Sequence, residues 1–191
     1  QRILKRKSLV RKLVAAETLG SVSVICTDKT GTITEGQMRV THFVTANESH
    51  AIEALPESSS TIESMLMVMA LCNDAILSSD GEARGTPTER ALLDAYVGLR
   101  KDRESLLTLH PRVAEVPFDS AKKFMMTVHR WEEGSRSLLK GASSSVLPRC
   151  SQMELGGETV KLTQDRLAGL EAQELTLTRQ GIRLIALAQK D

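Results

Sequence analysis

One segment restricts the possible folds of this chain more than any other: an apolar run followed at once by Asp28-Lys29-Thr30-Gly31-Thr32-Ile33-Thr34. The run over residues 21–27 is rich in β-branched side chains and predicts a short strand. A carboxylate at the carboxyl end of such a strand lies where ligands bind in parallel α/β sheets. Lys29 can neutralise phosphate charge, and Gly31 lets backbone amides approach phosphate oxygens. Asp28 is also a competent nucleophile, although a strand, an Asp and a polar loop alone are more typical of an Asp-initiated turn without a ligand.

Composition excludes several classes of protein. The 25 basic and 24 acidic residues among 191 give a net charge of +1, which argues against a nucleic-acid-binding chain. The three cysteines are scattered and form no CxxC pair, so we expect reduced thiols in a cytosolic setting rather than disulfides or a zinc site. No apolar run approaches the roughly 18 residues that cross a bilayer. No Walker A glycine pattern precedes a lysine, so that type of phosphate loop is not expected.

Positive charge gathers at the start of the chain, where six basic residues precede the first acidic one, Glu17: Arg2, Lys5, Arg6, Lys7, Arg11 and Lys12. Two interpretations fit this pattern. It is typical of a solvated helix face, and it is also typical of a segment beside a membrane with anionic headgroups.

Periodicity, caps and turn residues predict a mixture of helices and strands. A Thr86-Pro87-Thr88-Glu89 start signal marks one helix with particular clarity, because Pro is favoured at the first helical position. We expect helices over residues 8–18, 60–73, 87–100 and 164–180, and one more that ends near residue 111. We expect strands over residues 21–27, 37–46, 113–118, 124–131, 137–140 and 182–188, a helical turn at 142–146 and a hairpin at 156–157.

The exact string from Asp28 to Thr34 resembles the phosphorylation signature of P-type ATPases, although that family usually has Leu where this chain has Ile33. Residues 9–13 and 16–21 resemble the stalk that joins the fourth membrane helix of these pumps to their phosphorylation domain. Further motifs follow in the family's order and resemble its type II branch, which includes calcium pumps: Cys72-Asn73-Asp74-Ala75, Gly85 to Leu93, Pro117-Phe118-Asp119-Ser120 with Lys122-Lys123, Lys140-Gly141-Ala142 and Gly181-Ile182-Arg183.

The resemblance implies an α/β fold in two parts. Residues 1–38 would be the stalk end and an incomplete first piece of a haloacid-dehalogenase-like phosphorylation domain. Residues 39–191 would be a nucleotide-binding domain, an antiparallel sheet flanked by helices. We therefore expect an excised, soluble, monomeric piece from the cytosolic face of a membrane pump. Its partners would be ATP and the rest of that pump: the remaining phosphorylation domain, the actuator domain and the membrane helices.

The resemblance also assigns roles to individual residues. Asp28, Lys29 and Thr30 would be catalytic, and Asp28 and Thr30 would contact Mg²⁺. ATP would be held by Glu89, Phe118, Lys123, Lys140 and Arg183. Without the resemblance each of these residues has a plainer explanation: Glu89 caps a helix, Phe118 fills the core and the lysines are solvated. Arg183, in an expected apolar strand, would need a partner for its buried charge.

In the intact pump ATP would phosphorylate Asp28, and hydrolysis of the aspartyl-phosphate would drive transport of a cation, with calcium as the first expectation. The piece itself is expected to bind ATP without turnover. Two other functions remain open. A soluble haloacid-dehalogenase-type phosphatase would usually have a second Asp two residues after the nucleophile, where this chain has Thr30. A non-catalytic nucleotide-binding regulatory module would not need the complete set of basic residues.

Overall fold

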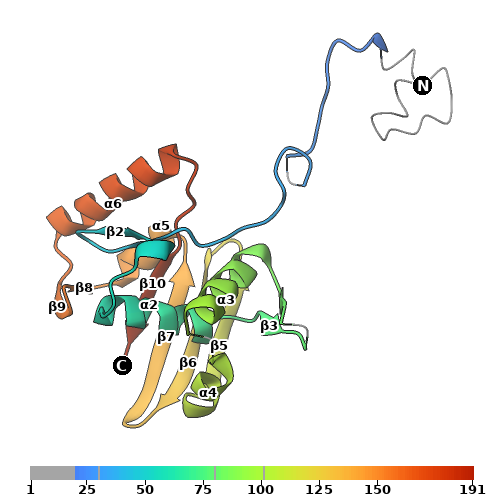
Figure 1. The fold of residues 1–191 in the computed structure, drawn as a ribbon. Coiled ribbons are helices and arrows are strands. Elements are labelled where there is room, and N and C mark those ends of the chain that lie inside the picture. Colours follow the sequence, from blue (N-terminus) through green and yellow to red (C-terminus); the bar gives the residue numbers. More distant parts are fainter. Residues whose placement is uncertain (1–19, 30, 80, 101) are drawn as a thin grey trace. The chain divides into compact units, whose positions relative to one another are not determined.

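The computed structural model describes residues 20–29, 31–79, 81–100 and 102–191, and its contacts divide the chain into two units, Gln1–Gln37 and Met38–Asp191. The second unit holds all the helices and strands described below (Figure 1). Within the described part of the chain, no helix combines the length and the apolar character needed to cross a bilayer.

A four-stranded antiparallel sheet forms the frame of the second unit, in the order β10-β7-β6-β5. Its strands are β5 (Arg112–Asp119), β6 (Phe124–Trp131), β7 (Gly134–Gly141) and β10 (Ala186–Lys190). Along β6 the side chains of Met125, Thr127 and His129 are buried while their neighbours are less so. This period of two is expected for a sheet with one face on the core.

Three two-stranded hairpins form separate small sheets. They are β1 (His42–Val44) with β2 (Ser49–Ala51), β3 (Ile76–Leu77) with β4 (Ala83–Arg84), and β8 (Gln152–Leu155) with β9 (Glu158–Lys161). Gly156 and Gly157 join β8 to β9, both with positive φ, which confirms the hairpin predicted there. Two short 3₁₀ helices, η2 (Ile52–Ala54) and η3 (Leu147–Arg149), complete the connections.

The helices are α2 (Ser60–Leu71), α3 (Pro87–Arg100), α4 (Arg103–Leu109), α5 (Ser143–Val146) and α6 (Gln164–Arg179). Helix α2 packs against β7 and β10 of the sheet and against α3. The cap of α2 is Ser59, one residue before the predicted start, and its hydroxyl accepts a hydrogen bond from the Ile62 N–H. The predicted start of α3 is confirmed, because Thr86 accepts from the Glu89 N–H.

Helix α2 lies between two parts of the core. One part joins α2 to α3 and β1 and consists of Phe43, Ile62, Leu66, Met69, Ala70, Leu92, Ala95 and Tyr96. The other joins α2 to the sheet and consists of Val68, Leu71, Cys72, Met125 and Leu138. A helix with apolar residues on both sides is buried between layers, so the end of α2 is held firmly against the sheet.

One predicted strand is wrong, and another begins later than predicted. Residues 21–27 form no strand, and Val24 and Ile25 are 75% and 79% exposed. A strand exists only by pairing, and no described strand pairs with this segment. The last strand begins at Ala186 rather than at residue 182, because β7 ends at Gly141, opposite Ala186, and has no residue left to pair with the segment before it. The strand predicted over residues 37–46 is shorter, with only β1 formed.

Candidate functional site

Several of the predicted nucleotide-binding residues lie at one end of the four-stranded sheet, where β5 ends, β6 begins and β7 ends. Asp119 pairs with Phe124, and Phe124 pairs with Gly141. Phe118, Lys123 and Lys140 are each one residue from this row. The structure therefore brings these three predicted residues to one end of the sheet.

Lys140 and Glu89 form an ion pair across this end of the sheet. The Lys140 Nζ donates to Glu89 Oε1 at 3.0 Å, and the side chains are only 7% and 13% exposed. Lys140 is therefore not the solvated surface charge that its residue type alone suggests. A buried charge is tolerated where it is paired and hydrogen-bonded, so this pair fixes both side chains in place.

Glu89 accepts two further hydrogen bonds. The Asp74 N–H donates to Oε1 at 3.2 Å and the Thr86 hydroxyl donates to Oε2 at 3.0 Å. Burial alone would raise the pKa of Glu89, but Lys140, the Asp74 N–H and the Thr86 hydroxyl together lower it. Glu89 is thus a carboxylate at neutral pH. Its Oε2 binds the hydroxyl of Thr86, the residue that caps α3, while its Oε1 faces a buried cation.

Phe118 lies near the end of β5 with 61% of its surface exposed. The core position that a lone Phe usually takes is therefore not the one found here. An exposed phenylalanine ring at a strand end offers a flat apolar surface to a ligand.

Lys123 lies in the turn between β5 and β6 and has a φ of 59°, the only positive φ at a non-glycine among the described residues. The turn is built around it. Asp119 caps it by accepting from the Ala121 and Lys122 N–H groups at 2.8 Å each, and the Lys123 carbonyl accepts from the Ala142 N–H at 3.0 Å. The left-handed conformation costs a lysine roughly 1–2 kcal/mol relative to the usual backbone, and a strained residue of this kind is often retained for function.

Gly141 makes the close approach of β7 to this turn possible. A Cβ at this position would lie 2.5 Å from the Lys123 carbonyl oxygen and 2.7 Å from the Phe124 Cβ. Close packing therefore explains why a glycine follows Lys140. It keeps the end of β7 against the start of β6, and with it the position of Lys140.

Arg183 is exposed and lies in the segment between α6 and β10, not in a strand. Its charge is therefore not buried, and the prediction that Arg183 needs a partner for a buried charge is wrong. It stands three residues before Ala186, which pairs with Gly141, so the register still leads this arginine toward the same sheet end.

Asp28 and Lys29 belong to the first unit and are exposed. The Lys29 carbonyl accepts from the Ile33 and Thr34 N–H groups, both at 3.0 Å, and closes a tight turn around Gly31, whose φ is 78°. Thr30 lies outside the described residues. Among the residues that the structure describes, no group of three or more His, Cys, Asp or Glu side chains could hold a metal ion.

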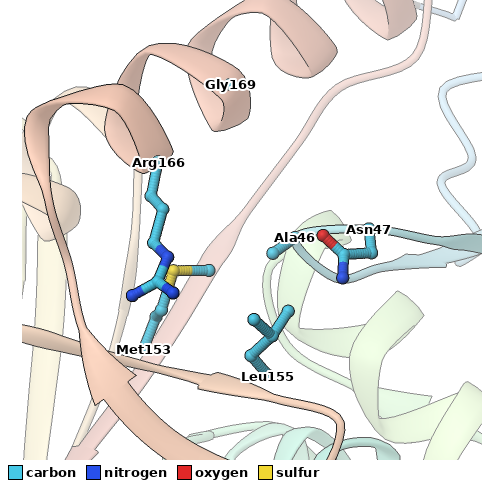
Figure 2. A pocket seen from close by; sticks show the side chains of 6 residues that line it. All are labelled: Ala46, Asn47, Met153, Leu155, Arg166 and Gly169. Carbon is cyan, nitrogen blue, oxygen red and sulfur yellow. The ribbon is translucent and has the colours of Figure 1, made fainter.

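A pocket of about 170 Å³ lies elsewhere, between the β1–β2 turn, the β8–β9 hairpin and α6. Figure 2 shows the Arg166 side chain reaching from α6 toward Met153 at one side of it. None of the predicted site residues lines this pocket. It therefore adds nothing to the chemistry at the sheet end.

The resemblance pointed to the Cys72–Ala75 motif, but sequence reasoning missed its contact with Glu89 and the two arginines that hold it. The loop after α2, Cys72–Ala75, donates the Asp74 N–H, and two arginines, Arg103 and Arg112, bind its carbonyl groups. One weak signal existed. Arg103 is the first residue of α4, where a positive charge interacts unfavourably with the helix dipole. An arginine at this position therefore suggests an interaction outside that helix.

These features define an α/β domain whose antiparallel sheet has, at one end, a buried carboxylate–ammonium pair and an exposed aromatic ring. A family model described as P-type ATPase, cytoplasmic domain N, matches residues 61–191. Calcium-transporting ATPase 1 of Bacillus cereus is 40% identical over 191 residues, which are 100% of this chain and 21% of that protein. Calcium-transporting ATPase lmo0841 of Listeria monocytogenes is 37% identical over 99% of this chain and 22% of its own length. Calcium-transporting ATPase 1 of Schizosaccharomyces pombe is 32% identical over 98% of this chain and 22% of its own length.

The chain belongs to the P-type ATPase family, and residues 61–191 match its cytoplasmic N domain. The chain spans about a fifth of the length of these relatives.

Proposed function

We propose that this chain is the ATP-binding part of a P-type cation pump, with ATP bound by the unit Met38–Asp191 and Asp28 as the phosphoryl acceptor. Calcium is the proposed cargo, because the relatives carry calcium transport in their names. The observation that carries the proposal is the buried Lys140–Glu89 pair, which lies at the same end of the sheet as exposed Phe118. Two fixed opposite charges next to a bare ring suit a ligand that is both aromatic and polar.

Each side chain has a proposed role in holding ATP. Phe118 stacks on the adenine ring, an interaction worth roughly 1–3 kcal/mol. Glu89 has acceptor capacity left on Oε2, which takes one hydrogen bond, from the Thr86 hydroxyl, and so can accept from the amino group of a base. Lys123 and Arg183, both exposed, supply positive charge to the phosphates. Lys140 keeps Glu89 charged and faces the adenosine.

The proposed reaction in the intact pump is transfer of the γ-phosphoryl group to Asp28. A carboxylate oxygen of Asp28 forms a bond to the γ-phosphorus while the bond from that phosphorus to the β–γ bridging oxygen breaks, and ADP leaves. Water then hydrolyses the aspartyl-phosphate. Lys29 would neutralise phosphate charge beside the nucleophile, and Thr30 would supply a hydroxyl.

Mg²⁺ would neutralise charge on the transferred group. Asp28 offers one carboxylate, but the described residues do not form a complete metal site. We therefore assign Asp28 and Thr30 only as two of its contacts, and the other ligands to the rest of the phosphorylation domain.

The proposed organisation follows from these roles. Residues 1–38 would be the stalk end and the first piece of a haloacid-dehalogenase-like phosphorylation domain, and residues 39–191 the nucleotide-binding domain. The remaining phosphorylation domain, the actuator domain and the membrane helices of the same pump would be the partners, and the chain would lie on the cytosolic face. By itself we expect it to be a monomer that binds ATP without turnover.

A titration of the 191-residue chain with ATP, followed by backbone amide NMR, tests the binding. We expect shifts around Glu89, Phe118, Lys140 and Arg183. Phe118→Ala should weaken binding by roughly 5- to 150-fold, the equivalent of one stacking contact. Val113→Ala is the matched control, because Val113 is an exposed apolar residue on the same strand, 52% exposed and farther from the sheet end. A folded chain with no ATP-dependent shifts would contradict the proposal, and phosphate release would favour the phosphatase instead.

A further inference from the structure

The backbone of the loop Cys72–Ala75 is held by the side chain of Arg103. Its Nε donates to the Ala70 carbonyl at 2.9 Å, its Nη1 to the Ala75 carbonyl at 2.6 Å and its Nη2 to the Asn73 carbonyl at 2.9 Å. Arg103 is only 8% exposed. A single guanidinium thus joins the last turn of α2 to both ends of the loop that follows it.

Arg112 holds the same loop from β5. Its Nη2 donates to the Leu71 and Asn73 carbonyls at 3.1 and 2.9 Å, and its Nη1 donates to Asp74 Oδ1 at 2.7 Å and to Glu115 Oε2 at 2.8 Å. The Asn73 carbonyl therefore accepts from both arginines. Its peptide plane, which also contains the Asp74 N–H, cannot rotate without losing these bonds.

That N–H is the one that reaches Glu89. It shares Oε1 with the Lys140 ammonium. The Asn73 side chain adds a second link, because its Nδ2 donates to the Glu89 carbonyl at 3.0 Å and its Oδ1 accepts from the Ala75 N–H at 2.8 Å. The loop thus reaches Glu89 through both a side chain and the backbone.

Holding the loop with Arg103 requires the burial of a positive charge. Its guanidinium donates three hydrogen bonds, all to neutral carbonyls, so its buried charge has no hydrogen-bonded carboxylate among the described residues. Burial, and then the positive charge of Arg112, lower the pKa of Arg103, while the carboxylates of Asp74 and Glu89 act in the opposite direction. A planar fork is the side chain that can reach three carbonyls at once. Arg103 therefore acts by holding three carbonyl groups in a fixed arrangement and not by pairing with a carboxylate.

We propose that Arg103 is a positioning residue for nucleotide binding, which fixes the Asn73–Asp74 peptide so that its N–H holds Glu89 in place against Lys140. The inference rests on the proposed ATP site, to which it adds a residue that does not itself touch the ligand. Arg112 supports the same peptide from the other side.

The test compares Arg103→Lys with the matched control Arg100→Lys in the 191-residue chain. Lysine keeps the charge but loses the fork. Arg100 is also an arginine bound to α2, through Glu63, but it does not contact the loop. Folding is followed by the fluorescence of Trp131, the only tryptophan, the pKa of Glu89 by NMR of its side-chain carboxyl, and ATP affinity by titration.

We expect Arg103→Lys to raise the pKa of Glu89, because the Asp74 N–H that stabilises its carboxylate turns away, and to weaken ATP binding by at least about fivefold. Arg100→Lys should change neither quantity. In a Glu89→Gln background, Arg103→Lys should have no further effect on affinity, because it acts through that carboxylate. A general loss of stability would not produce this pattern.

Three outcomes would overturn the inference: an unchanged pKa of Glu89 in Arg103→Lys, unchanged ATP affinity in that variant, or an equal loss of affinity with Glu89→Gln already present. If the wild-type chain binds no ATP, the proposed function fails, and the pKa comparison alone then decides whether Arg103 positions Glu89. If Arg103→Lys does not fold, Arg112→Lys takes its place. Arg112 is partly exposed, binds the same Asn73 carbonyl and should shift Glu89 in the same direction.

Discussion

Lys123 shows how function and local stability can oppose each other at one residue. Its φ of 59° suits glycine, yet the residue carries an ammonium at the sheet end that we assign to ATP. Lys123→Gly should leave the free energy of unfolding within about 1 kcal/mol of wild type, because relief of backbone strain offsets the added freedom of the unfolded chain. ATP affinity should fall, and its dependence on salt should weaken, because one phosphate contact is lost.

Lys122→Gly is the matched control for this prediction. The neighbouring lysine is also exposed, but its φ is not positive. Glycine there should destabilise the turn without the relief of strain, and should change ATP affinity less. Denaturant unfolding and ATP titration at two salt concentrations measure both effects. Equal behaviour of the two variants would contradict the role given to Lys123.

Residue-level reasoning from sequence reached part of the site and missed the rest for a physical reason. The Thr86–Glu89 cap is local, with donor and acceptor three positions apart, and so it is visible in the sequence. The Glu89–Lys140 pair joins residues 51 positions apart, and Arg103 reaches the Asn73 carbonyl 30 positions back. Such contacts depend on how helices pack on the sheet, which residue types do not reveal.

Elements were predictable where their pairing partners follow directly in the chain. The limits of β6 match the prediction because a tight turn joins it to β7. Residues 21–27 have the β-branched composition of a strand, but the described residues offer them no neighbouring strand. Composition indicates that a segment can be a strand, whereas a partner determines that it is one.

The link between β6 and the end of α4 gives a prediction at the scale of elements. His129 is fully buried on β6, and its ring nitrogens lie 2.9 Å from the His110 carbonyl and 3.0 Å from the Thr127 hydroxyl. Burial, the largest cause, lowers the pKa of His129 below its ordinary value of 6.5 despite the His110 carbonyl. The unfolded chain therefore takes up a proton at a higher pH than the folded one.

The sign of the pH effect follows. His129 contributes its full share of stability above the unfolded pKa of 6.5, and this share is lost as the pH falls from there toward the lower folded pKa. The free energy of unfolding of the wild type should decrease as the pH falls across this range. In His129→Gln the free energy of unfolding should depend less steeply on pH. Denaturant unfolding at several pH values measures it. Val128→Ala is the control, because Val128 is next to His129 on β6 and has no titratable group. It should lower the free energy of unfolding without changing its pH dependence. A similar loss of pH dependence in Val128→Ala would contradict the assignment of this effect to His129.

At the scale of the whole chain, stability and nucleotide binding should both belong to one unit. All three clusters of buried apolar residues lie within Met38–Asp191, whereas none of the described residues between 20 and 37 is buried. Hydrophobic burial is the dominant favourable contribution to folding. A chain cut to residues 38–191 should therefore keep the unfolding free energy and ATP affinity of the 191-residue chain.

Two further variants sharpen this prediction. Asp28→Asn in the full chain should bind ATP like the wild type, because the phosphoryl acceptor lies outside the binding unit. A chain that starts at residue 45 also loses Val40 and Phe43, which pack in the core between α2 and α3, and should be clearly less stable. Unfolding followed by Trp131 fluorescence and ATP titration compare the four chains. If residues 38–191 folded but bound ATP much more weakly than the full chain, part of the nucleotide site would have to lie in residues 1–37, and the division of labour between binding and phosphorylation proposed here would be wrong.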